Sequence, residues 1–219
     1  SQGGAGKEGF QMTELIQRTE EWFTIRRGKV TASRVADLTS KTKSGWGASR
    51  GNYMAQLIAE RLTGTTAESY TNAAMQWGTD TEPQARAAYE FFEGVEVKEI
   101  GFVIHPKIKE AGASPDGFVD KDGEVQIKCP NTATHIETLL VKKIPAKYIT
   151  QMQWGLACSG RKWCDFVSFD PRMPPHLQLF VKRVHRDDER IEALEEMVVE
   201  FLGELDAKVA ALNALEEAA

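Results

Sequence analysis

Residues 83–169 alternate between helix-like and strand-like patterns, and this order restricts the possible folds more than any other feature of the chain. A helical pattern ends near Gly94, three strand-like stretches follow, and two more helical patterns precede a further strand. The successive segments are 83–93, 95–104, 113–119, 124–129, 134–143, 147–159 and 163–169. This order predicts an α/β fold in which one mixed central sheet is flanked by helices.

The remaining patterns fit a single domain. We predict a helix over 53–62, a strand over 177–184 and a long amphipathic C-terminal helix over 190–215. Residues 1–11 hold four glycines in the first nine positions and precede Met12, so we interpret them as a remnant of an expression vector; a native flexible tail is the alternative. Residues 12–219 are long enough for one domain with its own core.

Acidic residues concentrate at the C-terminus. Residues 187–219 carry 11 Asp or Glu and two basic residues, a net charge of −9, which leaves +4 for residues 1–186 from the total of −5. We expect the acidic face of the terminal helix to be solvated, with a partner-binding role as the alternative. The three cysteines and four histidines are too scattered for a disulfide framework or a zinc site.

The chain shows no sign of membrane insertion or export. No apolar run approaches the roughly 18 residues that span a bilayer, and the N-terminus lacks a signal-peptide pattern. We therefore expect a cytoplasmic protein without membrane contact.

A helix start is predicted around residue 82. Asp80 and Thr81 are cap-type residues, Pro83 suits the first helical position, and Gly94 can end the helix. Glu82 is therefore expected at the N-terminus of this helix.

Two neighbouring strands bring together groups that suit a metal. A turn at Asp122-Gly123 places Asp116 beside residues 126–128. Because side chains alternate, Val125 and Ile127 are expected to face the core, and the opposite face gathers the carboxylate, amide and ammonium groups of Glu124, Gln126 and Lys128. Oxygen ligands from Asp116, Glu82 and residue 126 would suit Mg²⁺ better than zinc, and Lys128 could help to deprotonate the attacking water.

Several motifs in one order resemble the lambda-exonuclease (YqaJ-type viral recombinase) family of alkaline exonucleases, within the PD-(D/E)xK nucleases. The central motif is SPDG at 114–117 followed by QIKCP at 126–130. The supporting motifs are Trp22 with RRGKVTAS at 26–33, Trp77-Gly78 with Glu82, Tyr148 with Gln151 and Gln153, and FDPRM at 169–173. The resemblance implies a restriction-endonuclease-like core.

The resemblance also implies site residues. Asp116, the residue at 126 and the backbone carbonyl of Ile127 would bind the catalytic Mg²⁺, which Mn²⁺ can replace, with two ions in the active enzyme. Glu82 would assist as a ligand, Lys128 would orient the nucleophilic water, and Gln151 would position a metal-bound water or the phosphate. All of these except Ile127 are the implied catalytic residues.

Arg26 and Ser33 match the family positions that bind the 5′-phosphate of a DNA end. Arg26 could instead pair only with a nearby acid, and Ser33 could be a helix N-cap. Residues 40–51 are predicted to form a mobile basic loop that either contacts DNA or is a surface excursion; its candidate contacts are Lys41, Lys43, Trp46 and Arg50.

Gln126 departs from the family pattern, which has an acidic residue, usually Glu, at this position. The neutral amide removes one negative charge from a site that holds divalent cations, so metal affinity and turnover should fall while the fold and DNA binding persist. This favours an engineered, inactivated variant; a naturally degenerate enzyme is the alternative.

The implied activity is 5′→3′ digestion of linear double-stranded DNA, which releases 5′ mononucleotides and leaves a 3′ overhang for phage-type recombination. The implied partners are double-stranded DNA ends, two further copies of the chain in a homotrimer, and a single-strand annealing protein. A PD-(D/E)xK endonuclease or a catalytically dead DNA-end-binding module are the alternatives.

Overall fold

The computed structural model describes residues 12, 13, 15–67 and 72–217, so the predicted tail at 1–11 lies outside the described residues. Strands form a five-stranded sheet, a four-stranded sheet and a small hairpin. The helices in chain order are α1 (Glu20–Arg26), α2 (Val35–Leu38), α3 (Ala48–Thr63), α4 (Ala73–Glu93), α5 (Thr132–Val141), α6 (Ala146–Ser159) and α7 (Asp188–Glu217). A short 3-10 helix, η1 (Ala32–Arg34), precedes α2.

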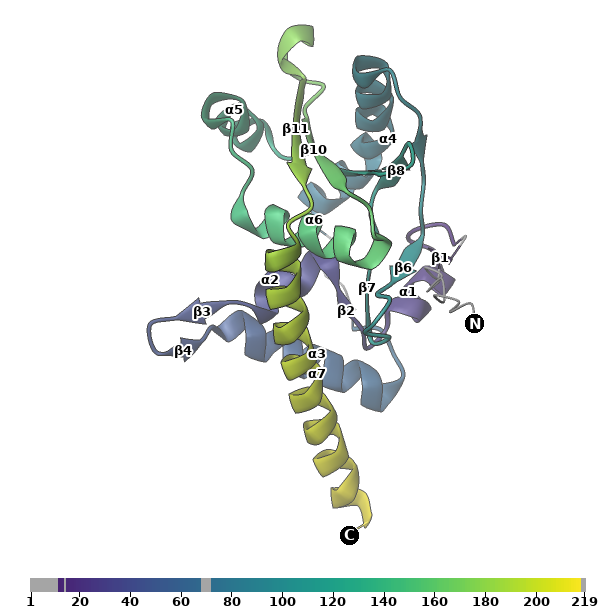
Figure 1. Cartoon of the computed structure of the whole chain (residues 1–219), viewed down its shortest axis with the longest axis vertical. Helices are drawn as coiled ribbons and strands as arrows, with labels where there is room; N and C mark the ends of the chain where they lie inside the picture. The colour runs from purple at the N-terminus through teal and green to yellow at the C-terminus, as the bar shows by residue number, and fades with distance from the viewer. Residues whose placement is uncertain (1–11, 14, 68–71, 218–219) are drawn as a thin grey trace, which may run out of the picture.

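The five-stranded sheet is mixed, as predicted. Its order is β11 (Leu179–His185), β10 (Trp163–Phe169), β9 (Gly123–Lys128), β8 (Gly117–Val119) and β5 (Val97–Lys98). The pair β9–β10 is parallel and the other pairs are antiparallel. The α/β class and the long C-terminal helix are therefore confirmed (Figure 1).

The second sheet was not foreseen as a separate unit. Its order is β1 (Met12–Thr13), β6 (Phe102–Ile104), β7 (Ala111–Ala113) and β2 (Val30–Thr31). The predicted strand at 95–104 is divided between β5 and β6, and the one at 113–119 between β7 and β8. The chain crosses from one sheet to the other at Gly101 and again at Pro115, which breaks both strands.

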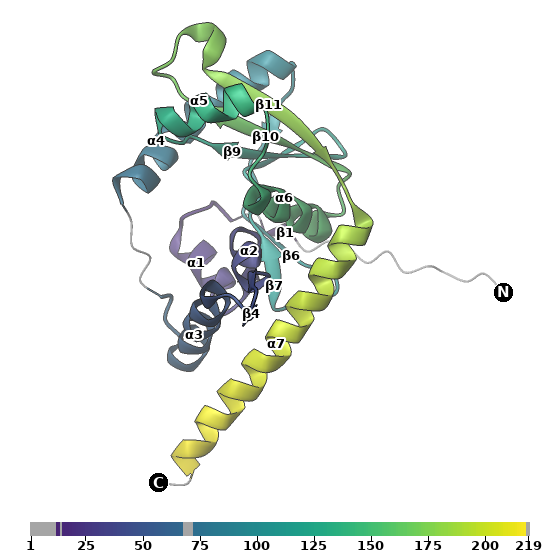
Figure 2. The ribbon, with the colours of Figure 1, turned by 90° about the vertical axis from the view of Figure 1, so that its left-hand side faces the viewer.

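Helix α6 lies between the two sheets (Figure 2). Met152 and Leu156 pack with Phe166 of β10, whereas Trp154 and Cys158 join a cluster with Val103 of β6. A helix that is buried on several sides is apolar around most of its circumference, and α6 follows this rule. The opposite face of the five-stranded sheet is covered by α4, through Ala85 and Tyr89.

Helix α4 begins earlier than predicted. Asn72 is its N-cap, because its side chain accepts a hydrogen bond from the Met75 N–H, and the helix continues through Pro83. Proline lacks the N–H that would bond to the carbonyl of Thr79. The helix continues nonetheless, and Ala85 and Tyr89, which follow Pro83, pack in the core. Glu82 therefore lies inside α4, and its predicted place at a helix N-terminus is wrong.

The turn before β9 also differs from the prediction. Val119 pairs with Gly123, so the turn comprises residues 120–122, and the positive φ is at Asp120. Gly123 is the first strand residue. A side chain at this position would collide with the ring of Trp163, whose atoms lie about 2.1 Å from the place of a Cβ.

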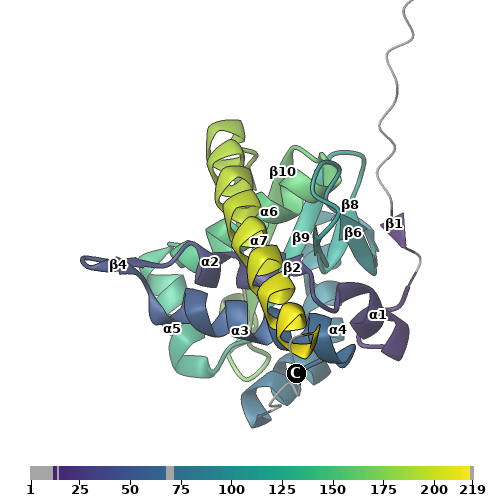
Figure 3. The same ribbon diagram turned by 90° about the horizontal axis from the view of Figure 1, so that it is seen from below.

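Residues 40–51, predicted to be a mobile basic loop, contain regular secondary structure. Strands β3 (Lys41–Thr42) and β4 (Gly45–Trp46) form a hairpin that projects from the body, as Figures 1 and 3 show, and α3 begins at Ala48. The Lys41 ammonium lies 4.8 Å from the centre of the Trp46 ring, a cation–π contact that helps to order the hairpin.

Helix α7 packs on the body with its N-terminal half. Leu194, Val198, Phe201 and Leu205 are buried, whereas Leu212 and Leu215 are exposed. No helix among the described residues is long and apolar enough to cross a membrane.

Candidate active site

Asp116 lies at the centre of the candidate site, where the chain passes from β7 to β8. Its Oδ2 accepts hydrogen bonds from the Gln126 side-chain amide at 2.5 Å and from the backbone N–H of Ile127 at 2.6 Å. The antiparallel pairing of Gly117 with Val125 produces this contact, since it places the residue before β8 beside the end of β9. The predicted proximity of Asp116 to residues 126 and 127 is therefore observed.

The surroundings disfavour the charged form of Asp116. Burial of the carboxyl group raises its pKa to about 6; Lys128 opposes this shift and Glu82 adds to it. The influence of Lys128 and Glu82 on the same carboxyl shows that the three residues form one electrostatic group.

Glu82 reaches this group from inside α4. One of its oxygens accepts a hydrogen bond from Arg18 at 2.7 Å and the other accepts one from Arg86 at 3.0 Å. Arg86 also pairs with Glu99 at 2.7 Å. Glu82 and Asp116 line one cavity of about 830 Å³ together with Arg18 and Arg86.

Lys128 is the last residue of β9 and is partly exposed. Its ammonium lies 5.0 Å from the ring centre of Tyr148 on α6. Gln151 follows Tyr148 by three residues on α6, so both lie on the same side of the helix, and Gln151 is partly exposed. Gln151 is thereby placed near the Lys128 end of the site.

Glu124 does not join this group, contrary to the expectation that it would meet Gln126 and Lys128 at the sheet edge. It lies beneath α6, where one carboxylate oxygen would be 2.7 Å from a Cβ placed on Gly155. Burial raises its pKa to about 7. Alternation along β9 is as predicted, with Val125 and Ile127 in the core under α4, but α6 also covers the other face.

The oxygen atoms around Asp116 are of the type that a hard cation binds, but they carry too little negative charge. Asp116 and Glu82 offer carboxylate oxygens, and the Gln126 side chain and the Ile127 carbonyl offer neutral ones, all of which Mg²⁺ accepts. Among the described residues, however, no three His, Cys, Asp or Glu gather in a metal-binding group. An acidic residue at 126 would add a third.

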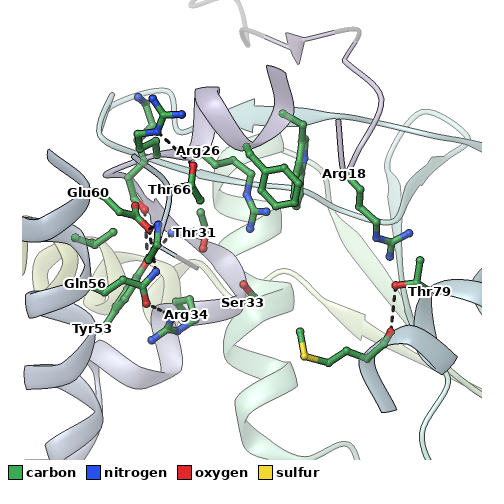
Figure 4. A pocket seen from close by; sticks show the side chains of 17 residues that line it. Arg18, Arg26, Thr31, Ser33, Arg34, Tyr53, Gln56, Glu60, Thr66 and Thr79 are labelled. Atoms are coloured by element: carbon green, nitrogen blue, oxygen red, sulfur yellow. Dashed lines mark hydrogen bonds between the residues drawn. The ribbon is translucent and has the colours of Figure 1, made fainter. Parts of the chain in front are cut away.

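A second cavity, of about 420 Å³, adjoins the first at Arg18, which lines both. Arg26 and Ser33 line this second cavity, as do Arg34, Tyr53 and Glu60 (Figure 4). The predicted pair Arg26 and Ser33 therefore lies in one cavity next to Asp116.

Arg26 carries a charge that the fold does not neutralise by contact. Its guanidinium stacks on Trp22, 3.7 Å from the ring centre, and its Nε is buried without a hydrogen-bond partner. Within the described part of the chain, no carboxylate lies within ion-pair distance of it. Burial lowers its pKa to about 10, so the group remains a cation at neutral pH.

Ser33 is the second residue of η1 and is exposed. The N-cap of η1 is Thr31, and no hydrogen bond from Ser33 is found among the described residues. The alternative that Ser33 is the N-cap of this helix is therefore wrong, and its hydroxyl faces the cavity.

The candidate DNA contacts at 40–51 lie apart from both cavities, and Arg50 is not a free surface group. Its side chain is buried and forms a two-point ion pair with Glu204 of α7, at 2.8 and 3.1 Å. It also stacks on Trp46 at 4.2 Å. Lys41, Lys43 and Trp46 are exposed on the hairpin.

Arg18 and Arg34 are among the cationic residues that line the two cavities and were not predicted as site residues. Arg34 stacks on Tyr53 at 4.2 Å and pairs with Asp37. No spacing or motif distinguishes either residue in the sequence, because their places depend on contacts with distant segments.

Comparisons with known proteins identify the family of the chain. Residues 21–162 match the YqaJ-like viral recombinase domain. The chain is 52% identical to an alkaline exonuclease from Laribacter hongkongensis, LHK-Exo, over 91% of this chain and 98% of that one, with a TM-score of 0.86. The structure of LHK-Exo in complex with dAMP matches equally, with 52% identity, 92% and 100% coverage and a TM-score of 0.87.

A phage-related exonuclease from Haemophilus somnus 129PT shares the fold at 18% identity, with coverage of 84% and 96% and a TM-score of 0.69. No curated protein sequence matches the chain. The fold is thus that of exonucleases of the PD-(D/E)xK type. Since the domain match covers more than half of its length, the chain belongs to the YqaJ-like viral recombinase family.

Proposed function

We propose that this fold is a Mg²⁺-dependent 5′→3′ exonuclease of linear double-stranded DNA, and that Gln126 makes this chain inactive or impaired. The observation that carries the proposal is the contact of Asp116 with Gln126 and Ile127, within the electrostatic reach of Glu82 and Lys128. Asp116 and Glu82 line a cavity that adjoins the one lined by Arg26. The 52% identity with an alkaline exonuclease supports a nuclease role.

The residues around Asp116 have distinct tasks. Asp116, Glu82, residue 126 and the Ile127 carbonyl would hold Mg²⁺, or Mn²⁺ in its place, as two ions in the active form. A bound metal would supply positive charge that neutralises the phosphate and lowers the pKa of a water. Lys128 would hold a water for attack, since it is the cation with the largest electrostatic influence on Asp116 and its ammonium lies against the Tyr148 ring.

Gln151 would position a metal-bound water or the phosphate from the α6 side of the site. As a neutral side chain with both donor and acceptor groups, it can bind either. Because Gln151 is neutral, it leaves Asp116 and Glu82 as the source of negative charge at the site.

The second cavity would set the polarity. A half-buried guanidinium whose Nε has no hydrogen-bond partner is suited to a terminal phosphate, which carries more negative charge than a phosphodiester and has three free oxygens. Arg26 would supply this charge and Ser33 a hydroxyl donor. A 5′-phosphate held there would place the adjoining phosphodiester toward Asp116, which gives 5′→3′ digestion with release of 5′ mononucleotides.

Gln126 specifically favours one other function, a DNA-end-binding module without catalysis. The described residues lack a third acidic ligand, while Arg26 and Ser33 line one cavity that does not depend on residue 126. Under this alternative the glutamine is native, and no single substitution need create activity.

The test compares this chain with its Gln126→Glu variant on 5′-phosphorylated linear duplex DNA. We expect the variant to release mononucleotides in Mg²⁺, at least about 100-fold faster than the unmodified chain, and to do nothing in EDTA. A matched 5′-hydroxyl duplex should be degraded more slowly, because it lacks the phosphate that Arg26 binds.

Closed circular plasmid serves as the control for internal cutting. An exonuclease leaves it intact, whereas a PD-(D/E)xK endonuclease cleaves it. If the variant degrades neither linear nor circular DNA, the metal assignment is overturned and the end-binding alternative gains support.

The family resemblance extends the proposal to assembly and pathway. We expect a homotrimer that retains DNA, a single-strand annealing protein that receives the 3′ overhang, and a cytoplasmic location during phage recombination. The +4 charge of residues 1–186 fits contact with DNA, and the acidic α7 fits a position away from it.

A further inference from the structure

Arg18 is the residue shared by the two cavities, and it is held there in an unusual backbone conformation. Its φ is +68°, in the left-handed region that non-glycine residues rarely adopt. Arg18 is neither a candidate metal ligand nor a candidate 5′-phosphate contact. It lines both the cavity that contains Asp116 and the cavity that contains Arg26. Figure 4 shows Arg18 and Arg26 extending into the same cavity from neighbouring segments.

The residues on either side of Arg18 fix its position. The Gln17 side-chain amide donates hydrogen bonds to the carbonyls of Ile100, at 2.7 Å, and Pro115, at 2.8 Å. Pro115 directly precedes Asp116, so the backbone at Arg18 is tied to the backbone of the candidate metal ligand.

A second set of contacts follows immediately in α1. Thr19 caps this helix by accepting a hydrogen bond from the Trp22 N–H. The Trp22 indole then donates to the Gly101 carbonyl at 3.1 Å and to the Ser114 hydroxyl at 3.0 Å. Arg18 therefore stands on a segment anchored on both sides to the segment that carries Asp116.

The present partner of Arg18 does not explain its placement. The ion pair with Glu82 is half-exposed on the Arg18 side, with 47% of the side chain accessible, and such pairs contribute little to stability. Glu82 has a second partner in Arg86 at 3.0 Å. Arg18 can thus leave Glu82 without stranding that carboxylate.

We propose that Arg18 binds a phosphodiester of the DNA strand that passes from the Arg26 pocket to Asp116, and that it exchanges Glu82 for this phosphate when DNA binds. This inference rests on the proposed function and adds a substrate-contacting residue to it. The guanidinium suits the task because it is permanently charged and can donate two parallel hydrogen bonds to phosphate oxygens.

The test measures binding of duplex DNA ends to the full chain by fluorescence anisotropy in EDTA, with 5′-phosphate and 5′-hydroxyl versions of one duplex. Arg18→Ala should weaken binding of both duplexes by about tenfold and reduce the slope of log K against log salt by about 1, as expected for one lost phosphate contact. The preference for the 5′-phosphate should stay unchanged. Arg26→Ala should instead abolish that preference.

Two matched variants separate this role from a structural one. Lys162→Ala removes an exposed cation that pairs with Asp122 and lines neither cavity, and it should change affinity by less than about threefold. In Arg18→Gly the new glycine tolerates the positive φ, so the melting temperature of this variant should lie within about 2 °C of that of the unmodified chain. Its affinity for DNA should nevertheless fall as much as that of Arg18→Ala.

The outcomes distinguish this inference from the proposed function. If the unmodified chain binds ends and prefers the 5′-phosphate, but Arg18→Ala and Arg18→Gly bind with the same affinity and salt slope, the role of Arg18 is overturned alone. Equal losses in Arg18→Ala and Lys162→Ala would also overturn it, since they would indicate a general effect of lost positive charge. Failure of the unmodified chain to bind DNA ends would overturn both.

Discussion

Among single residues, Glu124 is a carboxylic acid whose charged form the fold disfavours. It is 1% exposed under α6, one of its oxygens lacks a hydrogen-bond partner, and burial raises its pKa to about 7 from a usual 4.5. An acid with a raised pKa in the folded state makes the protein less stable as pH rises, because the unfolded chain ionises first.

We therefore predict that Glu124→Gln changes the pH dependence of stability. Between pH 4.5 and 7 the unmodified chain should lose about 3 kcal/mol of unfolding free energy relative to the variant, and the difference should level off above pH 7. Urea denaturation of both proteins at a series of pH values measures the difference, which cancels contributions from Asp116. A constant difference across this range would show that Glu124 is ionised in the fold.

At the scale of elements, the turn after β10 depends on one buried aspartate. Asp170 is fully buried and accepts hydrogen bonds from the Thr132 hydroxyl at 2.6 Å and from Arg172 Nε at 2.7 Å. Burial alone would raise its pKa, but these bonds outweigh it and lower the pKa to about 2. Arg172 in turn stacks on Trp77 of α4 at 4.3 Å, so this turn joins α4, α5 and the sheet.

Asp170→Asn should accordingly cost about 2 kcal/mol of unfolding free energy at pH 7. A depressed pKa contributes stability that is complete above about 3.8 and is lost as pH falls toward 2, so the gap between the two proteins should narrow below pH 4. Denaturation curves at pH 7 and pH 3 check this. An equal gap at both values would mean that the charge of Asp170 is unimportant and only its shape matters.

The elements also show what the sequence could predict. Strand β10 and helices α6 and α7 follow from strong periodicity with end signals such as Gly160, which ends α6 at a φ of +71°. The division of the sheets could not be foreseen, because the breaks at Gly101 and Pro115 are set by contacts with residues 15–22. No local pattern encodes contacts between segments about 80 to 100 residues apart.

The same distinction applies to the site. Asp116, Gln126 and Lys128 could be brought together from sequence because a short turn connects their strands. Arg18 could not, since its place depends on Gln17 reaching Ile100 and Pro115. Glu82 was predicted near the site but on the wrong part of its helix, because Pro83 was interpreted as a start signal.

At the scale of the whole molecule, α7 fastens the α2–α3 layer to the rest of the body. Leu205 is completely buried in the cluster that contains Tyr53, and Arg50 and Arg61 of α3 pair with Glu204 and Asp206. The last turns extend past this cluster into solvent (Figure 1).

Leu205→Ala should therefore lower the free energy of unfolding by about 2 to 5 kcal/mol, because it removes buried methyl groups and leaves a cavity. Leu212→Ala, on the same helix but exposed, is the matched control and should change stability by less than about 0.5 kcal/mol. Chemical denaturation checks both. Comparable losses would mean that the end of α7 packs as tightly as its middle.

We propose that Asp116 and residue 126 belong to one metal site that Gln126 deprives of a charge. Calorimetric titration with Mg²⁺ tests it most directly, on the unmodified chain, the Gln126→Glu variant, and that variant with Asp116→Asn added. We predict at least about tenfold tighter Mg²⁺ binding after Gln126→Glu, and loss of this gain when Asp116→Asn is added. Equal Mg²⁺ affinity in all three proteins would show that Asp116 and residue 126 do not form a metal site.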